Sequence, residues 1–338
     1  GFFTTANSTT EITGATYDTF VYGDGFGTDS THNGVGWYSL ASWNSKESTS
    51  LSTGITMVAT TALFDGFTPT AGYVMQASYA PSSDIVIDVA SGTVTQAQAG
   101  YAQILVADSV TKTGAGTVIF DAANPYTGPT RISAGTLRVA NANGLSASSV
   151  IVDTAATLAV ASGVTMKAPS VIVDGGSLSA ATLAVNATTG IAALAINAGT
   201  LAGSPATAVA AGGELLLAQD ARVTVAVGSL DVAETTGGGR VDLGGGEVAV
   251  AAGGITAAAL RADILAGRNG GGWNGATGIT SSAAAAAGGT RAVGYVVAGD
   301  GSARVSYAAP GDTNLNGQVD VFDLVSVNSA GKYGTGTA

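Results

Sequence analysis

The sequence has no cysteine, which excludes disulfides, thiol catalysis and Cys-ligated zinc. Its single histidine, His32, stands in a Thr-His-Asn-Gly stretch that is typical of a solvated turn, so a serine–histidine triad has little basis. No run of about 18 apolar residues without polar breaks occurs, and no membrane-spanning helix is expected. A chain without cross-links must obtain its stability from hydrogen-bond ladders and packing.

Basic residues are also scarce. Twelve Lys and Arg face 23 Asp and Glu, which gives a net charge of −11. Such a surface repels nucleic-acid phosphates and anionic membranes, and it favours cation binding. The basic residues are scattered along the chain, so nucleic acid is not an expected partner.

Glycine and small aliphatic residues make up much of what is present. There are 50 Gly, and 46% of the 338 residues are apolar, chiefly Ala and Val. A chain of this length can hold two or three domains. The composition is too apolar and too strand-patterned for disorder.

Short apolar runs separated by turn residues begin at Lys112–Val139 and continue for more than a hundred residues. This alternation predicts short β-strands. One row of apolar triplets recurs every 21 to 23 residues: Val150–Val152, Val171–Val173, Leu194–Ile196 and Leu215–Leu217. A second row keeps a similar step: Leu137, Leu158, Leu178, Leu201 and Val223. Two interleaved rows at one period predict an all-β fold, a right-handed parallel β-solenoid (β-helix) over residues 84–255.

Three sub-motifs occur in order within this stretch: Gly114-Ala-Gly-Thr-Val, Asn124-Pro-Tyr-Thr-Gly and Gly135-Thr-Leu. Together they resemble the autotransporter-associated β-strand repeat, a family of secreted and surface β-solenoid proteins of bacteria. The resemblance implies an extracellular or cell-surface location. Pro125 stands where the family usually has Thr, which a turn tolerates because the lost N–H need not belong to a ladder.

Residues 1–83 hold 13 of the 21 aromatic residues and lack the Ala/Val pattern. They are expected to form a β-rich N-terminal domain that caps the solenoid, since an open solenoid end exposes unpaired backbone groups. The expected strands are Thr19–Gly23, Ile55–Leu63 and Tyr73–Ala80. The aromatic cluster of Trp37, Tyr38 and Trp43 is either a core or a carbohydrate-stacking face. The start at Gly1 without Met suggests a processed N-terminus, and a fragment boundary would look the same.

Residues 256–309 break the repeat and are expected to form a C-terminal cap. Thr256–Ala266 has helical apolar spacing, with Thr256 as N-cap and Gly267 as the stop. Trp273 would close the last coil, and the Gly-rich segment around it resembles one in planctomycete secreted proteins just before a calcium-binding module. Val293–Ala298 and Ala303–Ala308 predict a hairpin, because Asp300-Gly is a strong turn signal.

Residues 310–338 contain the sharpest motif, a 12-residue loop from Asp312 to Asp323. Ca²⁺ takes six or more oxygens, which such a loop supplies from positions 1, 3, 5, 7, 9 and 12. The predicted ligands are Asp312, Asn314, Asn316, the main-chain carbonyl of Gln318, Asp320 and Asp323. Gly317 stands at the sixth position, where the chain turns sharply, and Val321–Asn328 is expected to be a single exiting helix. An ordinary Asx-rich turn is the alternative.

Asp at position 12 and the lack of an entering helix resemble the dockerin-type loop. Dockerins carry two such loops and this sequence has one, which speaks against cohesin binding. A second loop that processing has removed and a second loop that was never present are both consistent with this sequence. The loop is then expected to lock the C-terminus where calcium is plentiful.

Three functions are compatible with these features of the sequence. The first is a secreted structural protein of a cell surface or extracellular fibre, binding itself head-to-tail or other surface proteins. The second is an adhesin that binds polysaccharide through the aromatic cluster. The third is a β-helix lyase or hydrolase, which needs two carboxyls across a groove. Acidic residues along the repeat are sparse, and Asp153 and Asp174, one coil apart, are expected at solvated corners. The sequence therefore favours a protein that is not an enzyme.

Overall fold

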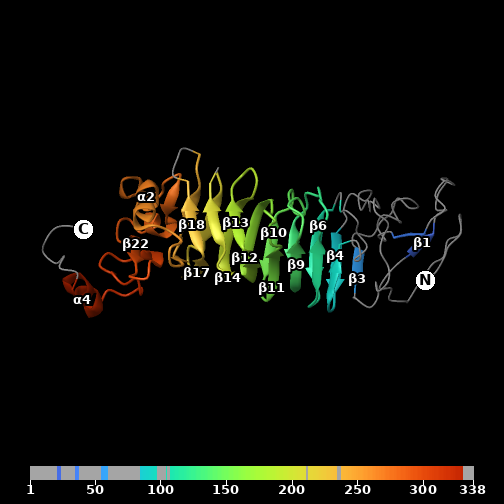
Figure 1. The fold of residues 1–338 in the computed structure, drawn as a ribbon, viewed down its shortest axis with the longest axis horizontal. Helices are drawn as coiled ribbons and strands as arrows, with labels where there is room; N and C mark the ends of the chain where they lie inside the picture. Colours follow the sequence, from blue (N-terminus) through green and yellow to red (C-terminus); the bar gives the residue numbers. More distant parts are fainter. Residues whose placement is uncertain are drawn as a thin grey trace. The chain divides into compact units, whose positions relative to one another are not determined.

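The computed structural model describes residues 21–23, 35–37, 55–59, 84–96, 104, 107–210, 212–233 and 237–329. Side chains are described only between 84 and 325. The chain divides into two compact units, residues 1–169 and 170–338. Figure 1 draws the described residues as a ribbon coloured along the sequence.

The first unit is built from short strands. They are β1 (Val21–Gly23), β2 (Val35–Trp37), β3 (Ile55–Ala59), β4 (Asp84–Val89), β5 (Thr93–Thr95), β6 (Ser109–Thr113), β7 (Thr117–Phe120), β8 (Thr130–Ile132), β9 (Gly135–Val139), β10 (Val150–Asp153) and β11 (Ala156–Val160). β1 and β2 form an antiparallel pair. Every other strand pairing described within this unit is parallel.

Each coil of the first unit contributes one strand to each of two parallel ladders. β3, β4, β6, β8 and β10 form one ladder, and β5, β7, β9 and β11 form the other. Val118, Leu137 and Leu158 lie in register on three successive coils, and all three side chains are fully buried. The predicted β-solenoid is confirmed, and the row that begins Leu137, Leu158 lines its interior here.

A lysine is buried inside this unit. The Lys112 side chain is 1% exposed, and its Nζ donates to the carbonyls of Thr113, Gly114 and Ala134 at 2.5, 2.8 and 3.2 Å. Burial lowers the pKa of Lys112 to about 8, and the nearby Asp88 opposes this shift. The ammonium therefore satisfies three carbonyls at a coil corner while paying a desolvation penalty.

The lowered pKa predicts a pH-dependent stability. Between pH 8 and 10.5 the unfolded chain binds a proton at this lysine that the folded chain has lost, so stability rises with pH. The gain is at most about 3 kcal/mol for the whole interval. Denaturant unfolding of the wild type and of Lys112→Met at pH 8 to 10 measures it. Because Met does not titrate, the stability difference between the two proteins should change with pH, and a constant difference would contradict the assignment.

The second unit continues with strands and adds four short helices. Its elements are β12 (Ala168–Ser179, which begins in the first unit), β13 (Thr182–Val185), β14 (Ile191–Ala202), β15 (Ala206–Val209), β16 (Glu214–Leu217), β17 (Thr224–Val227), β18 (Ser229–Val232), β19 (Arg240–Asp242), β20 (Glu247–Val250), α2 (Ala257–Arg268), η1 (Asn269–Gly271), β21 (Gly278–Thr280), α3 (Ser282–Ala286), β22 (Ala292–Val297), β23 (Ala303–Ala308) and α4 (Val321–Ser329).

Three parallel ladders organise this unit. The first is β13–β15–β18, the second β14–β16–β19–β21, and the third β17–β20. Leu194 pairs with Leu215 in the second ladder, as the apolar triplets predict, and both are fully buried. β21 pairs in parallel with β19, so the coil pattern extends to Thr280, with α2 carried in the connection.

The predicted helix is confirmed, but its predicted end is wrong. The Thr256 hydroxyl accepts a hydrogen bond from the N–H of Ala259, as an N-cap does. Gly267 lies inside α2, and the left-handed residue at the end is Asn269, with φ 44°. The reason is packing, because a Cβ on Gly267 would lie 1.9 Å from the carbonyl oxygen of Ile279 in β21. This glycine permits close approach of the helix to the strand.

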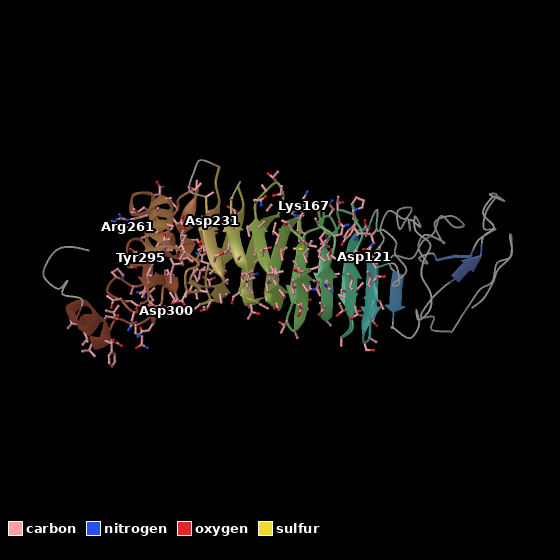
Figure 2. The ribbon with its side chains drawn as sticks, viewed as in Figure 1. Asp121, Lys167, Asp231, Arg261, Tyr295 and Asp300 are labelled. Carbon is pink, nitrogen blue, oxygen red and sulfur yellow. The ribbon has the colours of Figure 1, made fainter. Side chains whose placement is uncertain are left out.

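The predicted hairpin is also confirmed. β22 and β23 pair antiparallel, and the Asp300 carboxylate in their turn accepts hydrogen bonds from the N–H and hydroxyl of Ser302 (Figure 2). β23 pairs antiparallel with β20 as well, which joins the hairpin to the third ladder. Trp273, expected to close a coil, is buried, and its carbonyl accepts a hydrogen bond from the Thr280 hydroxyl.

Several expectations for the N-terminal region lie outside the described residues. They concern His32, the strand over Tyr73–Ala80 and the side chains of Trp37, Tyr38 and Trp43. β1 and β3 fall within two of the three strands expected there. Among the helices in the described part of the chain, none has the length and apolar character needed to cross a membrane.

Candidate metal centre

The predicted calcium loop follows the hairpin directly. It begins at Asp312 after β23 and ends at Asp323 in the first turn of α4, so a strand and not a helix enters it, and a helix leaves it (Figure 1). The backbone turns through two left-handed residues, Leu315 with φ 56° and Gly317 with φ 90°. Glycine adopts this conformation without a steric penalty, whereas a leucine is held there by its surroundings.

Asp312, at the first position, lies in the hollow of this turn and is 6% exposed. Its Oδ1 accepts the N–H of Asn316 at 3.1 Å, and its Oδ2 accepts the N–H of Gly317 at 2.9 Å. The amide oxygen of Asn314 accepts the same Asn316 N–H at 2.9 Å, and the amide oxygen of Asn316 accepts the N–H of Gln318 at 2.8 Å. The side-chain oxygens of positions 1, 3 and 5 are thereby gathered around one bend.

Asp323, at the twelfth position, draws the two ends of the loop together. Its Oδ1 accepts the N–H groups of Thr313 at 2.7 Å and Asn314 at 3.2 Å, and its Oδ2 accepts the N–H of Asp320 at 2.9 Å. The Asp320 N–H, with those of Thr313 and Asn314, lowers the pKa of the Asp323 carboxyl. It therefore stays ionised at neutral pH, as a metal ligand must.

The donor set fits a hard cation. All six predicted ligands offer oxygen, which suits Ca²⁺, and each carboxylate oxygen that accepts one N–H keeps a second lone pair. One oxygen of Asp320 accepts the N–H of Phe322 at 2.9 Å at the start of α4. Within the described residues, no three acidic or histidine side chains converge as a ready-made metal cluster. A cation here would depend on the Asn amides and the Gln318 carbonyl as much as on the carboxylates.

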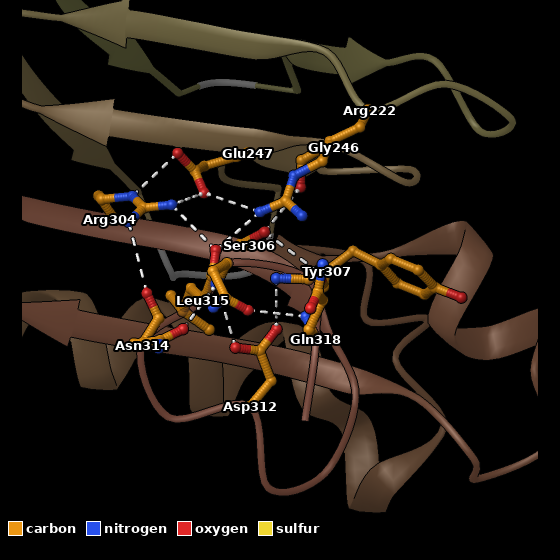
Figure 3. Close-up of polar contacts among 12 residues, drawn as sticks. Arg222, Gly246, Glu247, Arg304, Ser306, Tyr307, Asp312, Asn314, Leu315 and Gln318 are labelled. Atoms are coloured by element: carbon orange, nitrogen blue, oxygen red, sulfur yellow. Dashed lines mark hydrogen bonds and ion pairs between the residues drawn. The ribbon is translucent and has the colours of Figure 1, made fainter. Parts of the chain in front are cut away.

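Three charged residues from distant parts of the unit hold the loop, and we name Arg222, Glu247 and Arg304 the arginine clamp (Figure 3). Arg304 contacts the Glu247 carboxylate with two nitrogens, at 2.6 and 3.0 Å, while Arg222 lies 3.6 Å from it. Both guanidinium groups donate to the carbonyl oxygen of Leu315, at 2.7 Å from Arg222 and 3.0 Å from Arg304. The hydrogen bond to Glu247 raises the pKa of Arg304.

Leu315 is anchored through its side chain too. It is 2% exposed and packs against Gly294 of β22, where an added Cβ would lie 2.7 Å from the leucine Cδ2. The loop is thus fixed at its fourth residue by a buried side chain and by two charge-assisted hydrogen bonds to its carbonyl. This arrangement can present oxygen ligands to a cation, and its contacts hold the loop on β20 and β23.

A second polar network lies in the first unit, at the Asn124–Gly128 turn. The buried Asn124 side chain accepts hydrogen bonds from Gln96 Nε2 at 2.6 Å and the N–H of Ile104 at 2.9 Å, and it donates to Gln96 Oε1 and the Gly144 carbonyl. One amide thus satisfies polar groups of neighbouring coils that burial removes from water.

Tyr126, in the same turn, begins a chain of hydroxyl hydrogen bonds at this corner. The fully buried Tyr126 hydroxyl bonds to Thr130 Oγ1, which bonds to Ser148 Oγ at 2.7 Å, and Ser148 donates to the Gly128 carbonyl at 2.7 Å. Burial raises the pKa of Tyr126 to about 12. These residues act as internal structural groups of a solenoid corner.

The two acidic residues singled out from the repeat, Asp153 and Asp174, lie in different units. Asp153 ends β10, and its carboxylate accepts a hydrogen bond from Arg131 Nε at 2.7 Å. Asp174 is exposed on β12. Asp153 is thus partly buried and ion-paired and not at a solvated corner, whereas Asp174 is exposed as expected.

Comparison with known families finds one match. The family described as Passenger-associated-transport-repeat matches residues 110–139, which comprise nearly all of β6 and the whole of β7 to β9. Searches of curated proteins and of solved structures find no match. The matched family is a repeat of transported passengers and not an enzyme family. With the solenoid, the match indicates an autotransporter-passenger-like surface protein.

Proposed function

We propose that this protein is a secreted structural component of a bacterial cell surface or extracellular fibre, in which a calcium ion locks the C-terminal loop. The observation that carries the proposal is the register of the ladders. Fully buried aliphatic residues such as Val118, Leu137 and Leu158 repeat coil after coil, and the corners are satisfied internally. The passenger-repeat match supports the same location and role.

The calcium lock is supported by the two ends of the loop. Asp312 and Asp323 are both buried, both accept backbone N–H groups, and the lowered pKa of Asp323 keeps its charge at neutral pH. Two buried carboxylates at the ends of one loop are costly unless a cation compensates them. Arg304 of the arginine clamp interacts electrostatically with Asp312, but no described hydrogen bond or ion pair joins an arginine to either carboxylate.

Calcium is expected to raise the stability of the second unit. For a dissociation constant of 10⁻⁴ to 10⁻³ M, typical of extracellular modules, about 10 mM Ca²⁺ adds about 1.4 to 2.7 kcal/mol. Thermal unfolding with Ca²⁺ or with chelator, and calorimetric titration of the folded protein, measure the effect. Asp312→Asn and Asp323→Asn should abolish most of the shift, whereas Asp300→Asn, in the nearby hairpin turn, should keep it.

If the wild type binds no Ca²⁺ in the titration and shows no shift, the loop is an Asx-rich turn and the lock is wrong. If Ca²⁺ stabilised Asp312→Asn and Asp300→Asn equally, the lock would also be wrong, because the cation would then bind outside the loop. The structural role of the solenoid would still stand on its ladders.

Self-assembly is the finer part of the proposal, and the C-terminal segment is the surface that would take part. Its large apolar side chains are 53% to 67% exposed, namely Val319, Val321, Phe322, Leu324 and Val325. A cluster of this kind at one end of a chain favours contact with a second copy, and an unlike-ended contact builds an open filament. Light scattering and electron microscopy with millimolar Ca²⁺ test this, and a protein that stays monomeric without fibres would refute self-assembly.

A further inference from the structure

A cavity of about 190 Å³ lies beside the calcium loop in the second unit. Its walls are the side chains of Arg222, Arg291 and Tyr307 and the small residues Gly245, Ala308 and Gly317, among others. None of the residues lining it is acidic. The whole protein has a net charge of −11, whereas two arginines and no carboxylate line this cavity. The charge of its lining is therefore opposite in sign to the charge of the whole protein.

The first arginine is fixed in place and only partly neutralised. Arg222 donates to the Leu315 carbonyl at 2.7 Å, and its Nη1 lies so close to Gly317 that a Cβ there would come within 2.2 Å of it. The nearest carboxylate, Glu247, is 3.6 Å away and already takes two hydrogen bonds from Arg304. Arg304 thus takes both hydrogen bonds of Glu247 and also interacts with the Asp312 carboxylate, whereas Arg222 has no carboxylate within hydrogen-bond distance in the described part of the chain.

The second arginine has even less compensation. The Arg291 guanidinium lies 6.0 Å from the centroid of the Tyr307 ring, a weak cation–π contact. In the part of the chain that the structure describes, no carboxylate forms an ion pair with it. Arg222 and Arg291 are 69 positions apart in sequence, so only the fold brings them to the same cavity.

We propose that this cavity binds a small oxyanion, a carboxylate, sulfate or phosphate group, between Arg222 and Arg291. Guanidinium groups bind such groups through paired, charge-assisted hydrogen bonds, and two of them can share one anion. The volume equals that of about six water molecules in the liquid, at about 30 Å³ each, which admits a free ion or the charged group of one acidic sugar. The Tyr307 side chain gives the cavity an aromatic wall.

Calorimetric titration of the whole protein, freed of Ca²⁺ on a chelating resin and with none added, tests the site. The titrants are sodium sulfate, inorganic phosphate and D-galacturonate, with sodium chloride at matched ionic strength and neutral galactose as blanks. Saturable one-site binding of at least one oxyanion, and none of the blanks, is expected. Response to galacturonate alone would identify an acidic sugar as the source, and response to sulfate or phosphate alone would identify the free ion.

Arg291→Gln is the informative variant, because Arg291 contributes no described ion pair to the fold and its loss should leave the protein folded. We expect its affinity for the oxyanion to fall at least about tenfold, the loss of a charge-assisted contact. Arg261→Gln, which changes an exposed arginine of α2 in the same unit, should bind as the wild type does (Figure 2). The site is overturned if no titrant saturates, or if the two variants bind alike. Because Ca²⁺ is absent from every titration, this result is independent of the calcium lock.

Discussion

Replacing Gly135 with alanine is expected to lower the free energy of unfolding of the first unit by about 2 to 5 kcal/mol. Gly135 begins β9 with φ 64°, and a Cβ there would lie 2.4 Å from the carbonyl oxygens of both Gly114 and Gly116 on the preceding coil. Both are main-chain carbonyl oxygens, so neither can move unless the backbone of that coil shifts. The added methyl group therefore forces two coils apart near the C-terminal end of the matched repeat.

Gly163→Ala is the matched control for this prediction. Gly163 also has a left-handed backbone, with φ 76°, but an added Cβ meets nothing within 4 Å. Its cost is then conformational alone, about 1 to 2 kcal/mol. Urea unfolding of both variants, followed by circular dichroism, separates coil contact from backbone strain. Equal losses in the two variants would show that the contact between coils contributes nothing.

Replacing Glu247 with glutamine is expected to destabilise the second unit by about 2 to 3 kcal/mol. The Glu247 carboxylate is 5% exposed and holds Arg304 with two hydrogen bonds, so its neutralisation leaves guanidinium groups without their counter-charge. The figure is below that for a fully buried pair, because the Arg304 side chain is 42% exposed. Chemical unfolding with chelator present measures the effect without any contribution from calcium.

The control makes the same change on the surface. Glu214 accepts a hydrogen bond from Arg240 at 3.1 Å, but its side chain is 42% exposed. Glu214→Gln should therefore cost less than about 1 kcal/mol. Should both substitutions prove equally mild, the arginine clamp would be an ordinary surface ion pair and would not be what holds the loop.

The repeating part of the fold could be predicted because its signal is local. Leu137 and Leu158 face the interior on successive coils, and aliphatic residues at one period imply stacking whatever the connections do. The helix start at Thr256 was equally visible, since capping depends on neighbouring residues. The predicted helix stop at Gly267 was wrong, because this glycine permits the close approach of α2 to Ile279 in β21, a contact that neighbouring residues in the sequence do not reveal.

The candidate site was visible only in part for the same reason. The ligand spacing from Asp312 to Asp323 lies within one loop, so sequence shows it. The arginine clamp joins β20 and β23 with Arg222, which precedes β17, and its members are up to 82 positions apart. The one sequence feature that pointed to the arginine clamp was a charged residue, Glu247, at the start of an apolar strand. Nothing in the sequence indicated that Lys112 is buried, because its hydrogen-bond partners are main-chain carbonyls, which every residue has.

The uneven length of the coils has a consequence for how such a chain can change. Val150 follows its partner Thr130 by 20 residues, whereas Gly278 follows Arg240 by 38, yet both pairs keep parallel register. The longer step accommodates all of α2 outside the ladder. Evolution, or an engineer grafting a foreign epitope, can thus enlarge a connection and add a new surface while the strands it joins stay in place.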